Sequence, residues 1–273
     1  MYKLLITDLD DTLYSWIDFF VPAFYEMVRE LSSLTGIEEE TLLREYQEQH
    51  RMVGTVEFPF ITLRIPSINR LYLGLGEDEI KERLNSAFHK FNSVRKHQLK
   101  LFEGVDEVMQ KISEAGIIII GYTESAEENG FYRLKKLCIE KYFSKLYVSE
   151  SQYQMSKNTI LSSKTETVKG KKPNPEILTY ICAIQNMKTS DAIYMGDSLT
   201  KDIYMAKKAG IKSIQVKCQQ INPENYKKLV AISHWTEDDF DREQNLKETC
   251  QTELIKPDYE ITNFSELAGI MGI

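Results

Sequence analysis

The sequence predicts an α/β fold: a doubly wound parallel sheet with a smaller, all-helical domain inserted after the first strand. Two observations support the sheet. Short apolar runs without polar alternation recur along the chain, and amphipathic helical stretches separate most of them. Such strands are typical of parallel sheets that helices cover on both faces. A third observation supports the insertion, because residues 17–96 hold only helical patterns.

Six apolar runs are the predicted strands. They are Lys3–Thr7 and residues 117–123, 145–149, 192–196, 213–217 and 259–264. Two of the helices between them have clear signals. Residues 105–116 carry apolar side chains at helical spacing and end in Gly116, a good helix stop. Residues 198–210 offer Ser198 as the N-cap and Gly210 as the stop.

The insertion consists of several predicted helices. The first carries an apolar stripe from residue 17 to residue 31, in which Pro22 is expected to kink or restart the helix. Residues 38–50 and 77–91 supply two more. We expect the insertion over the carboxyl end of the first strand, where open α/β sheets bind ligands.

The predicted domain boundaries follow from this alternation. Residues 1–15 and 98–273 form the α/β core, and residues 16–97 form the helical domain. Within the core, residues 219–256 are polar and are predicted to be a solvated helix or loop before the last strand.

Composition excludes several classes of function. A net charge of −7 argues against non-specific binding to nucleic acid or to an anionic membrane. The four cysteines lie more than 30 positions apart and form no zinc-binding pattern. No apolar run approaches the ~20 residues of a membrane span, and the N-terminal run is too short for a signal peptide. We therefore expect a cytoplasmic protein that acts on a small molecule; its oligomeric state is not predicted.

Three acidic residues follow the first predicted strand. Asp8, Asp10 and Asp11 stand within four positions of one another, directly after an apolar run. Like charges this close repel each other. Either Asp10 or Asp11 caps the next helix, or a cation is expected there. Alternation along a strand would send the side chains of Asp8 and Asp10 toward the same side.

Polar residues also follow other strands. Thr123 ends the second apolar run, and the stretch "GKKPNPE" places Lys172 before Pro173. After the fourth run, Asp197 follows a glycine and Asp202 comes five residues later. Each of these residues alone suits a structural role, as a strand-end hydroxyl, a surface lysine or a helix cap.

Taken in order, "DLDDTL", the strand-end threonine, "KKPNP" and "GDSLTKDI" resemble the four motifs of the haloacid dehalogenase superfamily. The chain is similar to its phosphatase branch, whose Rossmann-like core often carries a helical cap after the first strand. This resemblance implies an Mg²⁺ ion held by Asp8, Asp197 and the main-chain carbonyl of Asp10, because Mg²⁺ prefers hard oxygen ligands. Asp202 completes the predicted metal set by orienting the groups around the ion.

The resemblance also implies roles in catalysis. Asp8 is the predicted nucleophile, which forms an aspartyl-phosphate, and Asp10 is the predicted acid and then base. Thr123 and Lys172 would hold the phosphoryl oxygens. The alternative to Lys172 is its neighbour Lys171, which lies one position further from the proline.

Two more residues belong to the predicted substrate-binding set. Thr12 is expected to orient the loop that carries Asp10. Glu124 stands where many members carry Asn or a small residue, so its carboxylate must face away from the phosphate or meet a cationic group of the substrate.

The leading hypothesis is therefore an Mg²⁺-dependent phosphatase that hydrolyses a small phosphorylated metabolite. A phosphomutase, a true dehalogenase and a non-catalytic binding protein with the same fold are the alternatives. The phosphatase hypothesis requires that the carboxyl groups of Asp8 and Asp197 lie close enough to share one ion.

Overall fold

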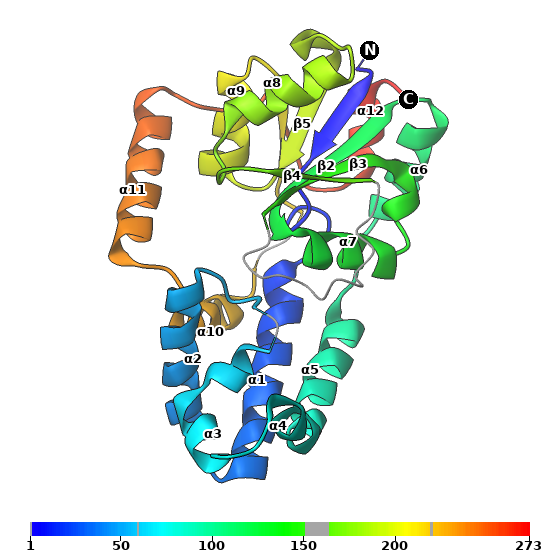
Figure 1. Cartoon of the computed structure of the whole chain (residues 1–273). Coiled ribbons are helices and arrows are strands. Elements are labelled where there is room, and N and C mark those ends of the chain that lie inside the picture. The colour runs from blue at the N-terminus through cyan, green and yellow to red at the C-terminus, as the bar shows by residue number, and fades with distance from the viewer. Residues whose placement is uncertain (1, 59, 151–163, 219–220) are drawn as a thin grey trace. The chain divides into compact units, whose positions relative to one another are not determined.

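The computed structural model describes residues 2–58, 60–150, 164–218 and 221–273, and these form two compact units (Figure 1). We call residues 1–15, 100–220 and 243–273 the core unit. Residues 16–99 and 221–242 form the helical unit.

The core unit is built on a sheet of seven strands in the order β4-β3-β2-β1-β5-β6-β7, with every paired neighbour parallel. The strands are β1 (Leu4–Thr7), β2 (Ile118–Ala126), β3 (Phe143–Ser149), β4 (Thr165–Val168), β5 (Ala192–Gly196), β6 (Lys212–Val216) and β7 (Tyr259–Ile261). Parallel strands need crossover connections, and helices supply them here. The predicted α/β fold with a parallel sheet is confirmed.

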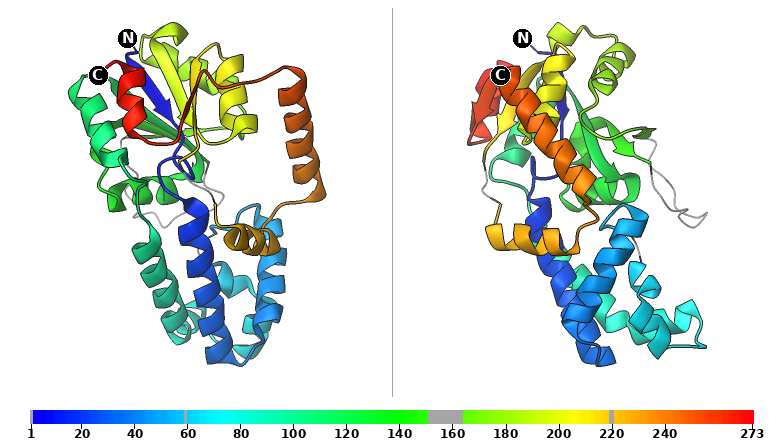
Figure 2. Two further views of the ribbon diagram at one scale, coloured as in Figure 1. Left: turned by 180° about the vertical axis from the view of Figure 1, so that it is seen from behind. Right: turned by 90° about the vertical axis from the view of Figure 1, so that its left-hand side faces the viewer.

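Helices cover both faces of this sheet (Figure 2). Those of the core unit are α6 (Val105–Glu114), α7 (Glu127–Lys136), α8 (Pro175–Ile184), α9 (Tyr204–Lys208) and α12 (Ser265–Met271). Helices α6 and α12 pack together on one face, and α8 and α9 pack together on the other. Leu4 and Ile6 of β1 lie in the apolar cluster that α8 and α9 close. Strand β1 is thus buried at the centre of the sheet.

The helix signals in the sequence are also confirmed. In α6 the buried residues are Val105, Val108, Met109 and Ile112, the face that the sequence predicts. The side chain of Ser198 accepts a hydrogen bond from the main-chain N–H of Lys201 and caps the next helical turn.

The register of the central strands sets the position of the polar residues. Thr7 of β1 lies opposite Gly121 of β2 on one side and Met195 of β5 on the other. The N–H of Asp8 donates to the carbonyl of Met195 at 2.8 Å. The residues that follow these strands therefore meet at one edge, the carboxyl edge of the sheet.

The helical unit contains no strand among its described residues. Its helices are α1 (Trp16–Thr35), α2 (Glu39–Val53), α3 (Pro66–Leu71), α4 (Glu77–Arg83), α5 (Asn85–Gln98) and α10 (Pro223–Ile232), and helix α11 (Glu237–Thr252) begins in this unit. Helix α1 continues through Pro22, so the expected restart of the helix does not occur.

One segment differs from the predicted domain division. Residues 221–242 were expected in the core, but α10 packs against α1 and α2. Leu229 and Ile232 are buried there, and the ring Nδ1 of His50 lies 2.7 Å from the carbonyl oxygen of Ile232. Helix α10 buries few apolar residues, Leu229 and Ile232, so its sequence is as polar as that of an exposed segment.

Strand β4 was not predicted. Its four residues, Thr165–Val168, include only one buried side chain, that of Val168, because β4 lies at the edge of the sheet. Edge strands are often short and polar, and β4 lacks the apolar run that marks the interior strands.

Two further findings concern the chain as a whole. All four cysteines are free thiols. Among the described residues, no helix combines the length and the apolar character that crossing a membrane requires.

We predict that Leu178→Ala lowers the free energy of unfolding by about 2–5 kcal/mol, because it leaves a cavity in the cluster between the sheet and α8. Ile184→Ala is the matched control on the same helix, since Ile184 is 53% exposed. It should change stability by less than about 0.5 kcal/mol. Urea unfolding of both variants measures the difference, and equal losses would contradict this packing.

Candidate active site

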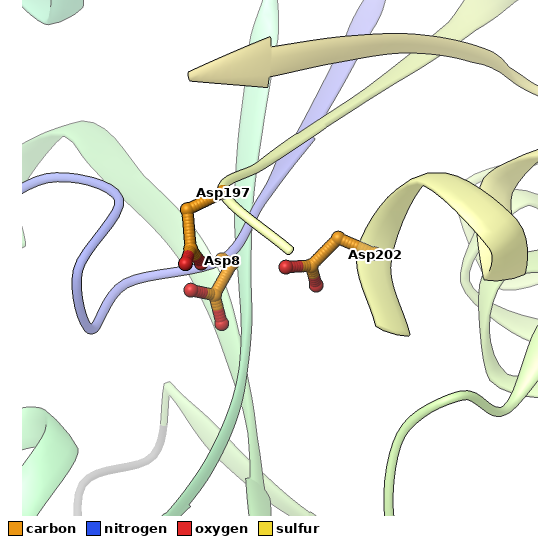
Figure 3. A group of neighbouring side chains, drawn as sticks. All are labelled: Asp8, Asp197 and Asp202. Atoms are coloured by element: carbon orange, nitrogen blue, oxygen red, sulfur yellow. The ribbon is translucent and has the colours of Figure 1, made fainter. Parts of the chain in front are cut away.

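Three carboxylates meet at the carboxyl edge of the sheet. Asp8 follows β1, Asp197 follows β5, and Asp202 lies on the helical turn Leu199–Ile203 that comes next (Figure 3). One oxygen from each lies within 4.8 Å of the others. Asp8 and Asp202 are buried. The carboxyl groups of Asp8 and Asp197 are thus close enough to share one ion, as the sequence hypothesis requires.

A buried ammonium lies between two of these carboxylates. The Nζ of Lys172 is 2.5 Å from Oδ1 of Asp8 and 2.8 Å from Oδ1 of Asp202. The rings of Tyr122 and Tyr194 lie beside it, with their centroids 5.0 Å and 5.7 Å from the Nζ. Charge-assisted hydrogen bonds in such a low-dielectric environment hold both partners firmly in place.

Asp202 is anchored by the protein itself. Its Oδ1 also accepts a hydrogen bond from the hydroxyl of Tyr194 at 2.8 Å, and its Oδ2 accepts one from the N–H of Ser198 at 3.1 Å. A Cβ atom at Gly196 would lie 2.4 Å from the carboxyl carbon of Asp202. Glycine is therefore required before Asp197, because any side chain there would displace Asp202 and with it Lys172.

The electrostatics of the cluster favour a cation. Burial raises the pKa of Asp8 well above its ordinary value, although the Lys172 ammonium acts in the opposite direction. Burial, followed by the charge of Asp202, raises the pKa of Asp197 to about 7. One ammonium cannot balance three carboxylates in a buried space.

Hard oxygen donors with an excess of negative charge are what Mg²⁺ prefers. The residues present thus fit a divalent ion, held by Asp8 and Asp197. Both oxygens of Asp202 already accept hydrogen bonds from the protein, so its position suits the orienting role that the family resemblance implies.

Asp10 lies in a separate network. Its Oδ1 accepts a hydrogen bond from Nη1 of Arg133 at 2.7 Å, and its Oδ2 accepts one from the hydroxyl of Ser125 at 2.7 Å. The hydroxyl of Thr123 is 3.4 Å from the same Oδ2. The carboxylate of Asp8 shares none of these partners, because β1 ends at Thr7 and strand alternation does not extend to Asp10.

The loop after β1 has a sharp turn. Asp11 adopts a left-handed conformation with φ of 58°, which aspartate tolerates better than most residues. Thr12 then turns back, and its hydroxyl lies 2.9 Å from Oδ2 of Asp8 and 3.3 Å from Oδ1 of Asp197. Thr12 thus contacts the two carboxylates that flank the predicted ion.

Glu124 faces protein cations. Its Oε2 is 2.8 Å from the Nζ of Lys201, and its Oε1 accepts a hydrogen bond from the main-chain N–H of Lys172 at 3.1 Å. The charge of Glu124, which is unexpected beside a phosphate site, is therefore balanced by the protein itself. Lys171 is exposed, so of the two candidate lysines only Lys172 reaches the carboxylates.

Sequence reasoning missed several residues of this site. Ser125 had a signal, because it lies two positions after Thr123 and therefore on the same side of the strand. Arg133, Tyr194 and Lys201 had none. Arg133 lies in α7, Tyr194 inside β5 and Lys201 on the turn Leu199–Ile203, and no sequence pattern links these positions to the site.

The chain is similar to several known proteins. A glyceraldehyde 3-phosphate phosphatase from Methanopyrus kandleri is 25% identical over 231 residues, which cover 82% of this chain and 89% of that protein. A 2-haloacid dehalogenase from Pseudomonas syringae pv. tomato has a TM-score of 0.56 at 20% identity, with 100% of this chain and 99% of that chain covered. A HAD phosphatase from Thermococcus onnurineus has a TM-score of 0.52 at 18% identity, with 99% and 98% covered. The last two show a shared fold.

The family model of the haloacid dehalogenase-like hydrolases matches residues 2–210. That range includes both the acidic loop after β1 and the carboxylates after β5. The prediction that the protein is an enzyme of the hydrolase class is confirmed: the chain belongs to the haloacid dehalogenase-like hydrolases.

Proposed function

We propose that the protein is an Mg²⁺-dependent phosphatase that hydrolyses a small phosphorylated metabolite through an aspartyl-phosphate. The observation that carries this proposal is the environment of Asp8. Its buried carboxylate stands at the carboxyl edge of the sheet, where it contacts the Lys172 ammonium and lies near the carboxylate of Asp197. A carboxylate placed in this way is oriented for attack on an electrophile that arrives with its own negative charge.

Asp8, Asp197 and the main-chain carbonyl of Asp10 would hold the Mg²⁺ ion. When bound, the ion supplies positive charge that offsets the repulsion between the carboxylates and an anionic substrate. Lys172 contacts two of the three neighbouring carboxylates, and its single positive charge does not balance all three.

In the first step, an oxygen of Asp8 attacks phosphorus and forms a new P–O bond. The bond from phosphorus to the leaving oxygen breaks, and that oxygen takes a proton from the carboxyl group of Asp10. The products are the aspartyl-phosphate at Asp8 and a free alcohol.

In the second step, the Asp10 carboxylate takes a proton from water as the water oxygen attacks phosphorus. The bond between phosphorus and Asp8 breaks, which restores the Asp8 carboxylate and releases inorganic phosphate. Asp10 ends the cycle protonated, ready for the next substrate. Atoms and charges balance over the two steps.

Lys172 and Thr123 would stabilise the transferring phosphoryl group. Burial opposes the charge of Lys172, yet the carboxylates of Asp202 and Asp8 raise its pKa well above the ordinary value, so it stays an ammonium. A preorganised donor of this kind contributes most where water is excluded.

We propose that the helical unit is the cap that the sequence predicts and that it selects the substrate. Chain connectivity supports this, because the loop that carries Asp8, Asp10 and Thr12 leads directly into α1. The curated relative is named a glyceraldehyde 3-phosphate phosphatase, so triose phosphates are the first substrates to test. Four free thiols are compatible with a reducing compartment such as the cytoplasm.

We predict that the purified protein releases phosphate from members of a panel of triose phosphates, sugar phosphates and nucleotides, and only with Mg²⁺. Asp8→Asn should abolish release while leaving the folded structure intact, because the amide is a poor nucleophile of nearly the same shape. A phosphate assay with circular dichroism as the folding control measures both. Isomerised sugar phosphate without free phosphate would indicate a mutase, metal-independent halide release a dehalogenase, and normal turnover by Asp8→Asn would exclude this nucleophile.

The two adjacent lysines offer a matched pair. Lys172→Met should lower kcat by about a hundredfold or more, because it removes the cation that contacts Asp8 and Asp202. Lys171→Met should leave kcat within about twofold, since that side chain is exposed. Steady-state kinetics on the best substrate of the panel measure both values. Equal losses of kcat in the two variants would contradict the assignment of Lys172 to the site.

The raised pKa of Asp197 predicts how pH and Mg²⁺ act together. Its pKa rises from 3.8 to about 7 on folding, so between these values the folded protein binds more protons than the unfolded chain. Its contribution to stability therefore decreases as the pH rises through this window without metal. Mg²⁺ binds the ionised carboxylates, so its stabilising effect should increase over the same window.

Thermal unfolding at about pH 5 and about pH 8, with and without Mg²⁺, measures this linkage. We expect a larger Mg²⁺-induced rise in Tm at the higher pH, and Asp197→Asn should remove most of it. A shift that is the same at both pH values would contradict the assignment of Asp197 to the metal.

A further inference from the structure

A closed ring of hydrogen bonds surrounds the carboxylate of Asp10. Nη1 of Arg133 donates to Oδ1 of Asp10 at 2.7 Å and reaches the hydroxyl oxygen of Ser125 at 2.8 Å. The Ser125 hydroxyl in turn donates to Oδ2 of Asp10 at 2.7 Å. Both carboxylate oxygens are therefore fixed, which sets the plane of the group as well as its position.

Arg133 is a charged residue of α7 that is almost fully buried. Its side chain is only 3% exposed, whereas the side chain of Asp10 is 22% exposed. Burying a guanidinium is costly unless it is paired, so a buried arginine usually has a specific task. Arg133 pairs with the carboxylate of Asp10, which lies on the turn just before Asp11, the residue with a positive φ.

Besides this ring, the hydroxyls of Tyr14 and Thr123 lie next to Asp10. The hydroxyl of Thr123 is 3.4 Å from Oδ2, at the limit of a hydrogen bond, and it also accepts one from the N–H of Ser125. Proton transfer requires that donor and acceptor meet within about 2.6–3.2 Å, so small displacements of the carboxylate matter.

We propose that Arg133, acting with Ser125, is the positioning residue that aims Asp10 at the leaving oxygen of the substrate. The inference rests on the phosphatase function proposed above, because that reaction gives Asp10 its proton to transfer. Arg133 contacts Asp10 and would act on the reaction through that carboxylate. A purely structural role, tying α7 to the loop after β1, would affect all substrates alike.

Two aryl phosphates separate these roles. Phenyl phosphate and 4-nitrophenyl phosphate have nearly the same shape, but nitrophenolate leaves without needing a proton, whereas phenolate gains from one. The ratio kcat/KM covers the steps up to formation of the aspartyl-phosphate, so it isolates the proton donation to the leaving group.

We expect Arg133→Gln to lower kcat/KM by about ten- to a hundredfold for phenyl phosphate and by less than about threefold for 4-nitrophenyl phosphate, as loss of a positioned general acid would. Asp10→Asn should show the same difference between the substrates. Adding Arg133→Gln to Asp10→Asn should cause little further loss, because both substitutions act on one group. Lys135→Gln, an exposed substitution on the same helix, should match the wild type.

Equal losses on both substrates, or additive losses in the double variant, would overturn the inference while leaving the phosphatase function intact. A wild-type protein that releases no phosphate with Mg²⁺ from either ester or from any member of the panel above would overturn both. Thermal unfolding checks that each variant is folded. Should Arg133→Gln fail to fold, Ser125→Ala decides: a selective loss on phenyl phosphate supports the inference, and a uniform loss or none overturns it.

Discussion

The site depends on the ammonium of Lys172, buried between the carboxylates of Asp8 and Asp202. This contact joins the loop after β1 to the helical turn after β5, and through Tyr194 and Ser198 it is tied to the sheet itself. It balances only part of the negative charge, because Asp197 lies beside the same cluster with a raised pKa. The resulting excess of negative charge is what makes the site suited to a divalent cation.

The strand register places these charges together. Strand β1 is the centre of the sheet, and its last residue lies opposite Gly121 and Met195. A slip of one residue would turn Leu4 and Ile6 away from the cluster that α8 and α9 close, and would move Asp8 away from Asp197. The same apolar side chains that stabilise the fold therefore determine the geometry of the carboxylates. Gly196 adds a local constraint, since only a residue without Cβ lets Asp202 approach the backbone.

Much of this architecture could be predicted from the sequence, and the exceptions have physical causes. Strand ends such as Asp8 and Asp197 were found because apolar runs stop abruptly before them. Strand β4 was not predicted, and the segment of α10 was expected in the core and not in the helical unit, because an edge strand and a short helix each bury few apolar residues. That Asp10 has other partners than Asp8 could not be seen either, since β1 ends at Thr7 and the alternation on which the expectation relied does not extend to Asp10. Arg133 comes from a distant helix, and no spacing along the chain links it to Asp10.

The two aspartates of the first motif are thus two positions apart in sequence and held by different cations. Asp8 is bound by a lysine within a cluster of carboxylates, where charge remains for an ion and a phosphoryl group to interact with. Asp10 is bound by an arginine whose planar guanidinium, together with Ser125, fixes both of its oxygens. Both oxygens of Asp8 are contacted as well, Oδ1 by Lys172 and Oδ2 by the hydroxyl of Thr12, which also reaches Asp197. A group that must deliver a proton and later accept one must keep the same orientation in both steps, and this is what a two-point contact provides. The two networks therefore differ in their surroundings: Lys172 is shared between two carboxylates, whereas Arg133 and Ser125 contact each other and a single carboxylate, that of Asp10.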